Sequence, residues 1–316
     1  MDISKITIAD VCTEWLNMKK LSVKQSTYAK YHYIIKTEIL PELGDYPLEK
    51  MNSSIINAFT SRKLGVDPNC TDRRLASKTV RDIYTILKSV LRYGENEYHT
   101  GPLAANTVLP KPKRESIETL TMMELRKIAK YLWERPWDAR CVGLLLCMYS
   151  GMRLGEICAL KWEDVDLDKK TIYIRHTMQR ITVPEENGES KTRIVVDEPK
   201  TQSSMRLIPI SDEIYPLIKN LHRFSGANAY FLSNTERFVE PRNYQYFFKS
   251  ILKKTEIRNV NFHILRHTFA TQCVEVGMDI KTLSEILGHS STNITLTYYV
   301  HSSLETKQKQ VNLLKI

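Results

Sequence analysis

A proline-rich segment limits the fold of this chain more than any other sequence feature. Residues 101–118, "GPLAANTVLPKPKRESIE", contain three prolines and a basic cluster. Proline fixes φ and has no N–H to donate, so this composition favours an extended linker over a helix or strand. Thr121 and Glu124 follow at the spacing of a capping box, which predicts the start of a new helix. The 316 residues are therefore expected to form two domains, with residues 106–118 as a linker.

The first domain, residues 1–105, has helical periodicity and no strand pattern. In "IADVCTEWLNMKK" the apolar residues Ile8 and Trp15 recur at helical spacing. A second helix is expected to begin at Ser26 and to stop at Pro41, because the proline ring cannot continue it. The segment "SKTVRDIYTILKSVLRYGENEY" has one apolar face, and its basic residues lie elsewhere on the helix. These patterns predict a small helical bundle with basic outer faces.

The second domain, residues 119–301, mixes helical and strand patterns. "ARCVGLLLCMYSG" is typical of a buried helix that ends at Gly151. Three segments alternate as strands of one short antiparallel sheet: "TIYIRHTMQRITV", "SKTRIVV" and "SMRLIPI", with "PEENGES" as a turn. Beyond residue 211 the pattern is helical again and includes "DIKTLSEILG", a helix that Gly288 closes. A tail, residues 302–316, carries a few apolar positions on a polar background.

Composition excludes several classes of protein. No apolar run has the length of a transmembrane helix, and the N-terminus lacks the order of a secretory signal, so a cytoplasmic protein is expected. The six cysteines include no C-x-x-C pair and no cysteine–histidine cluster with zinc spacing. Cys141, Cys147 and Cys158 lie in apolar surroundings and are interpreted as reduced core thiols.

The charge balance of the chain is basic. The formal net charge is +10 and the isoelectric point is near 9.2, with a positive excess in both predicted domains. Such a distribution is typical of a protein that contacts a polyanion along its length, and nucleic acid is the expected partner. A soluble basic protein without such a partner would have the same composition, so charge alone leaves both interpretations open.

Cations and proton carriers occur in four separate places where the backbone is expected to turn sharply. They are Arg153 with Glu156 after a helix stop, Lys200 before a strand, His263, Arg266 and His267 on one helical face, and His289 after Gly288. Each place also has a purely structural explanation. The arginine–glutamate spacing is common on helix surfaces, and a lysine in a turn is usually solvated. The two histidines at i, i+4 lack the glutamate of the zinc-protease motif, since Ile264 follows the first, so no metal site is expected.

Taken together, these residues suit one reaction, the attack of a tyrosine on a phosphodiester. A phenol has a pKa near 10, so about one in a thousand is ionised at neutral pH and the group needs activation. Two arginines can hold the non-bridging phosphate oxygens bidentately, and a lysine can protonate the departing oxygen. Histidines can move the remaining protons. The stretch "ITLTYYVH" supplies two adjacent tyrosines, Tyr298 and Tyr299, and periodicity does not choose between them.

Five segments in order closely resemble the tyrosine recombinases of the phage integrase family. They are "SGMRLGEICAL", "PKTQSSMRLIPI", "HILRHTFAT", "LGHSS" and "YYVH". The resemblance covers the whole chain, because residues 6–100 look like the core-DNA-binding domain of that family. It implies a multidomain α and α+β protein: a helical SAM-like domain, then a mostly helical catalytic domain with a small antiparallel sheet, the fold of DNA breaking-rejoining enzymes.

The resemblance also implies a role for each matching residue. Arg153 and Arg266 correspond to the arginine pair that binds the scissile phosphate, and Lys200 corresponds to the general acid. His263 would assist proton transfer, and His289 would contact the phosphate. No metal and no cofactor are implied.

Two supporting residues and the nucleophile follow from the same resemblance. Glu156 resembles an acidic residue that helps to hold the active site, and His267 matches a position with a structural role. The nucleophile of the family commonly stands two residues before a histidine, which selects Tyr299 because His301 follows it. Some relatives have a spacing that would select Tyr298 instead.

The function implied is site-specific recombination of double-stranded DNA through a 3′-phosphotyrosine, by a homotetramer on paired sites. An integrase of a mobile element is expected, and the chain is expected to begin directly at the core-binding domain. Weaker candidates for phosphate contacts are Lys24, Lys30, Lys78 and Arg81. The sequence leaves open whether a directionality factor or DNA-bending host protein takes part, and whether the tail packs on its own domain or on a neighbouring protomer.

Three rival interpretations share parts of these observations. A type IB topoisomerase has the same chemistry but does not exchange strands between duplexes. A housekeeping recombinase of the Xer type differs in its biological task and not in its catalytic residues. A DNA-binding regulator of the same fold would have lost catalysis, although every catalytic position is occupied here.

Overall fold

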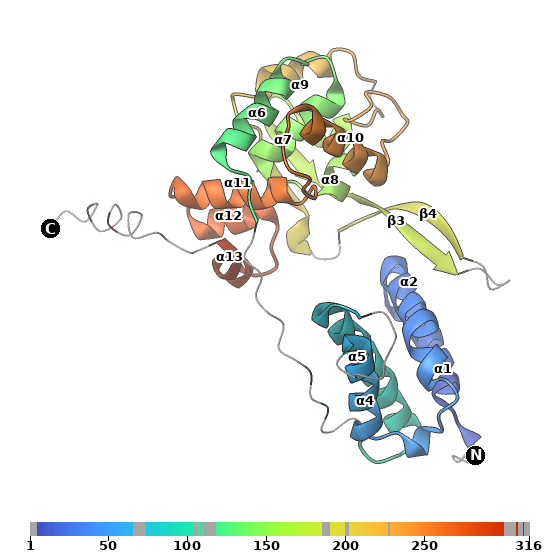
Figure 1. Ribbon diagram of the computed structural model, residues 1–316. Coiled ribbons are helices and arrows are strands. Elements are labelled where there is room, and N and C mark those ends of the chain that lie inside the picture. The colour runs from blue at the N-terminus through green and yellow to red at the C-terminus, as the bar shows by residue number, and fades with distance from the viewer. Residues whose placement is uncertain are drawn as a thin grey trace. The chain divides into compact units, whose positions relative to one another are not determined.

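The protein is described by a computed structural model, which covers residues 5–65, 74–103, 107, 109, 118–184, 190–199, 202–226, 228–299, 308 and 312. The chain divides into two compact units. The first holds Met1–Glu115 and Ile181–Arg193, and the second holds Ser116–Arg180 and Ile194–Ile316. Each unit has its own hydrophobic core, and Figure 1 shows the helices and strands of both units.

Helices make up the described N-terminal part of the first unit. They are α1 (Ile8–Ser22), α2 (Gln25–Ile34), α3 (Leu40–Leu43), α4 (Ser53–Leu64) and α5 (Ser77–Glu97). Helix α1 packs against α2, α3 and α5, and α4 packs against α5. Ile8 and Trp15 are buried in this core, as their spacing predicts. The predicted helical bundle is therefore confirmed for residues 5–65 and 74–103.

The second helix does not stop at Pro41, so this prediction is wrong. Helix α2 passes into one π-helical turn, Ile35–Ile39, and the Leu40 N–H then donates to the Ile35 carbonyl, five residues back. After this wide turn a new α-helix, α3, begins at Leu40, and Pro41 lies in its first turn. A helix start does not need the missing N–H of proline, and helical backbone therefore continues to Leu43.

The second unit is mostly helical. Its helices are α6 (Met122–Trp133), α7 (Ala139–Ser150), α8 (Leu154–Ala159), α9 (Tyr215–His222), α10 (Pro241–Lys254), α11 (Ile264–Glu275), α12 (Ile280–Leu287) and α13 (Thr292–Tyr299). The capping box of Thr121 and Glu124 starts α6 as predicted. Gly151 and Gly288 end α7 and α12 in the left-handed conformation, with φ of 64° and 63°, which also confirms the predictions.

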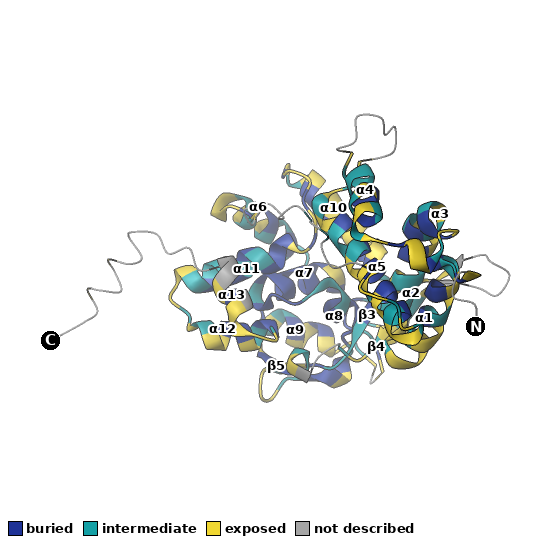
Figure 2. Ribbon diagram, turned by 90° about the horizontal axis from the view of Figure 1, so that it is seen from below, coloured by how far each residue is buried: buried dark blue, intermediate teal, exposed yellow. Residues whose placement is uncertain are grey.

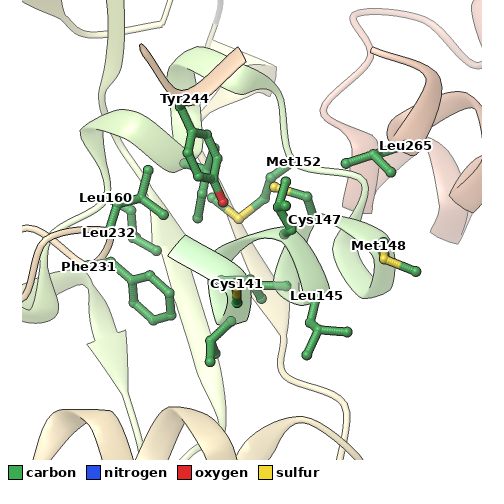
Figure 3. Close-up of a cluster of buried hydrophobic side chains, with 14 of the residues drawn as sticks. Cys141, Leu145, Cys147, Met148, Met152, Leu160, Phe231, Leu232, Tyr244 and Leu265 are labelled. Atoms are coloured by element: carbon green, nitrogen blue, oxygen red, sulfur yellow. The ribbon is translucent and has the colours of Figure 1, made fainter. Parts of the chain in front are cut away.

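Helix α7 lies at the centre of the second unit and packs against α6, α9 and α11. Every residue from Cys141 to Met148 is buried, as Figure 2 shows by colour. Leu145, Phe231, Leu232 and Tyr244 belong to the cluster of buried side chains around it (Figure 3). The Tyr244 hydroxyl donates to the Arg140 carbonyl at 2.8 Å, so the one polar atom of this ring is satisfied. The helix that carries the Gly151 turn is thereby held rigidly.

The predicted strands are present, but they form two sheets and not one. Strands β1 (Val165–Asp166), β2 (Thr171–Ile174) and β5 (Arg206–Pro209) make an antiparallel sheet in the order β1-β2-β5. Strands β3 (Thr177–Pro184) and β4 (Ser190–Asp197) form a separate two-stranded hairpin. The long predicted strand divides into β2 and β3, because residues 175 and 176 do not belong to a strand. Residues 185–189, most of the predicted turn, lie outside the described residues.

Two further sequence predictions concern burial. Cys141, Cys147 and Cys158 are buried and free, which confirms their interpretation as core thiols. In the part of the chain that the structure describes, no helix is long and apolar enough to cross a membrane. Most of the predicted linker and tail lie outside the described residues.

Candidate active site

The C-terminus of α12 collects three arginines from three different elements. Successive backbone carbonyls accept one hydrogen bond each: Ile286 from Arg206 Nε at 2.5 Å, Leu287 from Arg266 Nη2 at 2.8 Å, and Gly288 from Arg153 Nη2 at 3.1 Å. The last carbonyls of a helix have no partner within the helix and lie at the negative end of its dipole. Helix α12 therefore offers a fixed anchor for cations, next to His289.

Arg153 directly precedes α8, two residues after the Gly151 turn. Its Nη1 donates to Glu156 Oε1 at 2.6 Å, and its backbone N–H donates to Glu156 Oε2 at 2.8 Å. Its side chain remains 34% exposed. A guanidinium has five N–H donors, and two of them are used in these contacts, so others are available to a phosphate.

Glu156 is a buried carboxylate, 3% exposed, with a cation on each side. Besides Arg153 it accepts two parallel hydrogen bonds from Arg206, at 3.0 and 2.9 Å. Burial alone would raise the pKa of this carboxyl, but the hydrogen bonds and charge of Arg206, followed by Arg153, lower it to about 2. Glu156 is therefore ionised at neutral pH and holds two arginines together.

Arg266 lies at the floor of the site and is only 2% exposed. From α11 it donates to the Gly151 carbonyl at 2.9 Å as well as to Leu287. It thus joins the turn after α7 to the end of α12. Glycine is required at position 151, because an added Cβ would lie 2.8 Å from a Leu287 methyl group and φ there is positive.

His263 and His267 flank Arg266 on α11. His263 is the N-cap residue, and its ring meets that of His267 edge to face, with 4.7 Å between centroids. Desolvation by the surrounding protein, then the charges of His267, Arg266 and Arg153, lower the pKa of His263 to about 4, although the residue as a whole is exposed. Burial and Arg266 also lower the pKa of His267. Both rings are therefore neutral at pH 7.

His289 follows the Gly288 turn and is half-buried. Its Nδ1 lies 2.9 Å from the hydroxyl of Thr295, a fully buried residue of α13. Burial, followed by the charges of Arg266, Arg153 and Arg206, lowers its pKa to about 4. The charges of Arg266 and Arg153 act on both His289 and His263, so the structure brings these four residues into one site.

Helices α11, α12 and α13 pack against one another beside this site (Figure 1). Tyr299 is the last residue of α13, one helical turn after Thr295, and the structure does not describe its side chain. Lys200 and His301 lie outside the described residues. Of the six predicted catalytic residues, Arg153, His263, Arg266 and His289 therefore have described side chains, and these four lie together.

Arg206 was not among the residues predicted from the sequence. It lies on β5 and shares the buried face of that strand with Ile208, while Leu207 and Pro209 are exposed. The alternation in "SMRLIPI" carries this signal, because it places a charged residue at a core-facing position of a strand. A buried arginine needs a carboxylate and further acceptors, and Glu156 meets that need.

The four weaker candidates for DNA contacts belong to the first unit. Lys24, Lys30 and Lys78 are exposed and Arg81 is half-buried, on α5 or near the start of α2. Lys30 forms an ion pair with Asp82 at 2.9 Å. Among the residues that the structure covers, no group of three or more histidine, cysteine, aspartate or glutamate side chains could hold a metal ion.

Comparison with known families agrees with this geometry. Residues 118–306 match the family model described as "Phage integrase family", and residues 7–64 match "Phage integrase, N-terminal SAM-like domain". The first match alone spans more than half of the chain and includes the whole site. The predicted fold, a helical SAM-like domain followed by a mostly helical catalytic domain, is thereby confirmed.

Individual relatives and solved structures show the same likeness. The chain is 28% identical to "Tyrosine recombinase XerC-like" of Caldanaerobacter subterraneus subsp. tengcongensis, over 99% of this chain and 84% of that protein. It is 24% identical to "Transposase from transposon Tn916" of Enterococcus faecalis, over 54% of this chain and 44% of that protein. The fold is similar to the Tn1549 transposon integrase bound to circular intermediate DNA, with a TM-score of 0.76, 20% identity, and coverage of 98% and 100% of the two chains. The chain belongs to the phage integrase family of tyrosine recombinases.

Proposed function

We propose that this recombinase cuts and rejoins double-stranded DNA through Tyr299, to integrate or excise a mobile element. One observation carries the proposal: three arginines and His289 meet at the C-terminus of α12, next to the helix that ends with Tyr299. Three guanidinium groups against one carboxylate leave a site with a positive excess. A phosphodiester in the transition state of strand cleavage has the charge that such a site stabilises.

Arg153 and Arg266 would supply the phosphate contacts, with Arg153 as the more exposed of the two. His289 would donate to a phosphate oxygen through Nε2, since the Thr295 hydroxyl occupies its Nδ1. Glu156 would hold Arg153 in place, and His267 would pack against His263. Each role is one that the described contacts permit.

The proposed reaction has two transesterification steps. In the first, the Tyr299 oxygen attacks the scissile phosphorus and the bond to the 5′ oxygen breaks, which leaves a 3′-phosphotyrosine. His263, neutral at pH 7, accepts the phenol proton, and Lys200 protonates the departing 5′ oxygen. In the second step the 5′ hydroxyl of a partner strand attacks the phosphotyrosine and releases Tyr299. Each step exchanges one phosphate ester for another, so no energy source is consumed.

The DNA-bound assembly belongs to the same proposal. The helical domain, residues 1–105, and the catalytic domain, residues 119–301, would both contact DNA, with residues 106–118 between them. Lys24, Lys30, Lys78 and Arg81 are the weaker candidates for phosphate contacts. Solved relatives include a lambda integrase dimer on a core site and a tetramer on a Holliday junction. By analogy we propose that this chain forms a homotetramer on DNA in the cytoplasm. The tail, residues 302–316, would be exchanged between protomers. A directionality factor is a further partner that this assembly would accommodate.

A second candidate is a housekeeping recombinase, because a relative that matches nearly the whole chain is named XerC-like. The two candidates share their chemistry and differ in the DNA that they join. Integration or excision would connect the ends of an element to a target, whereas chromosome maintenance would act on a single chromosomal site. The identity of the covalently bound DNA therefore separates them.

Covalent trapping in cells tests the proposal even though the DNA site is unknown. The protein is expressed with its native genomic DNA, denatured, and the DNA that stays attached is sequenced. We expect one enriched junction, which disappears with Tyr299→Phe because phenylalanine has no nucleophilic oxygen. Tyr298→Phe is the matched control and should keep the junction.

The alternative outcomes are equally informative. Loss of the junction only with Tyr298→Phe would move the nucleophile by one residue. No covalent DNA with wild type, despite duplex binding, would contradict the proposed catalysis and favour a DNA-binding regulator.

A further inference from the structure

Arg153 and Arg206 both contact the Glu156 carboxylate and the end of α12, and Arg206 is the more buried of the two. It is 8% exposed. Four of its five guanidinium N–H donors are engaged within the protein: Nε with Ile286, Nη1 with Glu156 and with the Ser204 carbonyl at 3.0 Å, and Nη2 with Glu156. Because the side chain is also buried, these contacts within the protein are where its function is sought.

The partners of Arg206 come from three segments that carry proposed catalytic groups. Glu156 lies in α8 beside Arg153, and Ile286 precedes the Gly288 turn that leads to His289. Ser204 ends the 3-10 turn Gln202–Ser204, which follows Lys200 in the chain. The contact with the α12 end is close: a Cβ added to Gly288 would lie 2.9 Å from Arg206 Cδ. Arg206 thus ties together the start of α8, the end of α12 and the turn Gln202–Ser204.

The hydrogen bonds of Arg206 also limit how many Arg153 donors are bound by Glu156. The carboxylate accepts four described hydrogen bonds, two from Arg206 and two from Arg153, of which one is a backbone N–H. Only one side-chain donor of Arg153 is therefore consumed by Glu156. Without Arg206 the buried carboxylate would lose half of its hydrogen bonds, and it would draw further donors from Arg153 or take up a proton.

We propose that Arg206 is a positioning residue for DNA strand cleavage: by satisfying Glu156 and the end of α12, it keeps the Arg153 guanidinium turned toward the scissile phosphate. This inference rests on the proposed function, because the benefit to Arg153 matters only if Arg153 binds that phosphate. Arg206 itself touches neither DNA nor Tyr299 in this scheme.

Kinetics on a nicked duplex that carries the trapped junction test the proposal. Arg206→Met should lower the rate of covalent complex formation by about 100-fold, the usual effect of a small misplacement, and leave the Kd for duplex DNA within about threefold. Arg206→Lys keeps the charge but not the paired hydrogen bonds, and should lose less rate. Arg140→Met is the matched control, because Arg140 makes a similar paired contact with Asp138 outside the site. Wild-type rates in Arg206→Met would overturn the proposal.

A double variant separates positioning from mere packing. Glu156→Gln removes the charge that Arg206 satisfies, so Glu156→Gln with Arg206→Met should cleave about tenfold faster than Arg206→Met alone. If Arg206 only fills space, the second substitution should add its own loss and slow the reaction further. The double variant buries no unpaired charge, so it remains informative if Arg206→Met alone fails to fold.

A readout that does not depend on cleavage distinguishes failure of this inference from failure of the proposed function. Carboxyl-carbon NMR of the labelled full-length protein follows the titration of Glu156. In Arg206→Lys and Arg206→Met the pKa of Glu156 should rise from its low value, because its main partner is weakened or lost. An unchanged titration would overturn the inference even if the enzyme is active. A changed titration in a protein that never forms covalent DNA would leave the link to Glu156 intact and contradict only the function.

Discussion

At the scale of single residues, the two active-site histidines are kept neutral by their surroundings. Desolvation disfavours the protonated form of both His263 and His289, and the positive charges of Arg266 and Arg153 disfavour it further. Neutral imidazole can both accept and donate a proton, which is the property that proton transfer at pH 7 requires. Because the folded protein disfavours protonation of these rings, acid is expected to destabilise the fold.

We expect thermal stability to fall as the pH decreases from about 6.5 to about 4. The folded-state pKa of His263 and of His289 is about 4, whereas an unfolded imidazole titrates near 6.5. Between these values the unfolded chain binds protons that the folded protein does not, so acid favours unfolding and stability returns as the pH rises. Melting temperatures from pH 4 to pH 8 measure this slope.

The pair of substitutions His263→Gln and His289→Gln should flatten that dependence, because glutamine does not titrate in this range. His99→Asn, at an exposed position outside the site, is the control and should keep the wild-type slope. An unchanged slope in the double variant would contradict the assignment of acid sensitivity to these two rings.

At the scale of elements, the end of α12 organises the site and α13 is fastened to it. Three arginines from the α7–α8 turn, β5 and α11 share three successive carbonyls of one helix end. Thr295 then links α13 to His289 through its hydroxyl. Any shift of α12 would therefore move the three arginines and α13 together.

Thr295→Val should weaken catalysis while it preserves the fold. Valine has nearly the same shape but no hydroxyl, so His289 loses the partner that orients its ring, a hydrogen bond worth about 1 kcal/mol. The rate of covalent complex formation should fall about fivefold to tenfold, and nitrogen NMR should show a changed tautomer balance at His289. Thr292→Val, at the exposed start of α13, is the matched control. A wild-type rate and tautomer in Thr295→Val would show that the contact does not orient His289.

At the scale of the whole molecule, each unit has its own large hydrophobic core. Leu91 of α5 belongs to the first core and Leu145 of α7 to the second, and each is completely buried. Since neither cluster shares residues with the other, the two units have their own sources of hydrophobic stability.

Alanine substitutions should therefore destabilise one unit at a time. Leu91→Ala and Leu145→Ala each remove buried methyl groups and leave a cavity, at a cost of about 2 to 5 kcal/mol. Calorimetry should show that each substitution lowers the melting temperature of a different transition. Leu21→Ala, at a position 91% exposed, is the control and should change neither. A single transition that both buried substitutions lower equally would contradict independent cores.

Features that depend on short-range chemistry could be predicted from the sequence alone. The helical bundle, the capping box at Thr121 and the glycine stops at Gly151 and Gly288 follow from periodicity and from backbone preferences within a few residues. Arg153, Arg266 and His289 could be singled out because each adjoins or follows such a local signal, or belongs to a recognisable motif. These residues could be identified without a tertiary structure, but their arrangement in space could not be predicted without one.

The way in which these parts meet depends on long-range packing. The strands pair into two sheets, and the helix continues past Pro41 through a π turn that no spacing rule predicts. Arg206 contacts Glu156 and Ile286 across 50 and 80 residues of sequence, and Arg153 reaches Gly288 across 135. Local patterns contain no information on such contacts, because they form only when packing brings a strand, a helix start and a helix end to the same place. The physical reason is that a buried charge takes whichever partners the fold places within hydrogen-bonding distance.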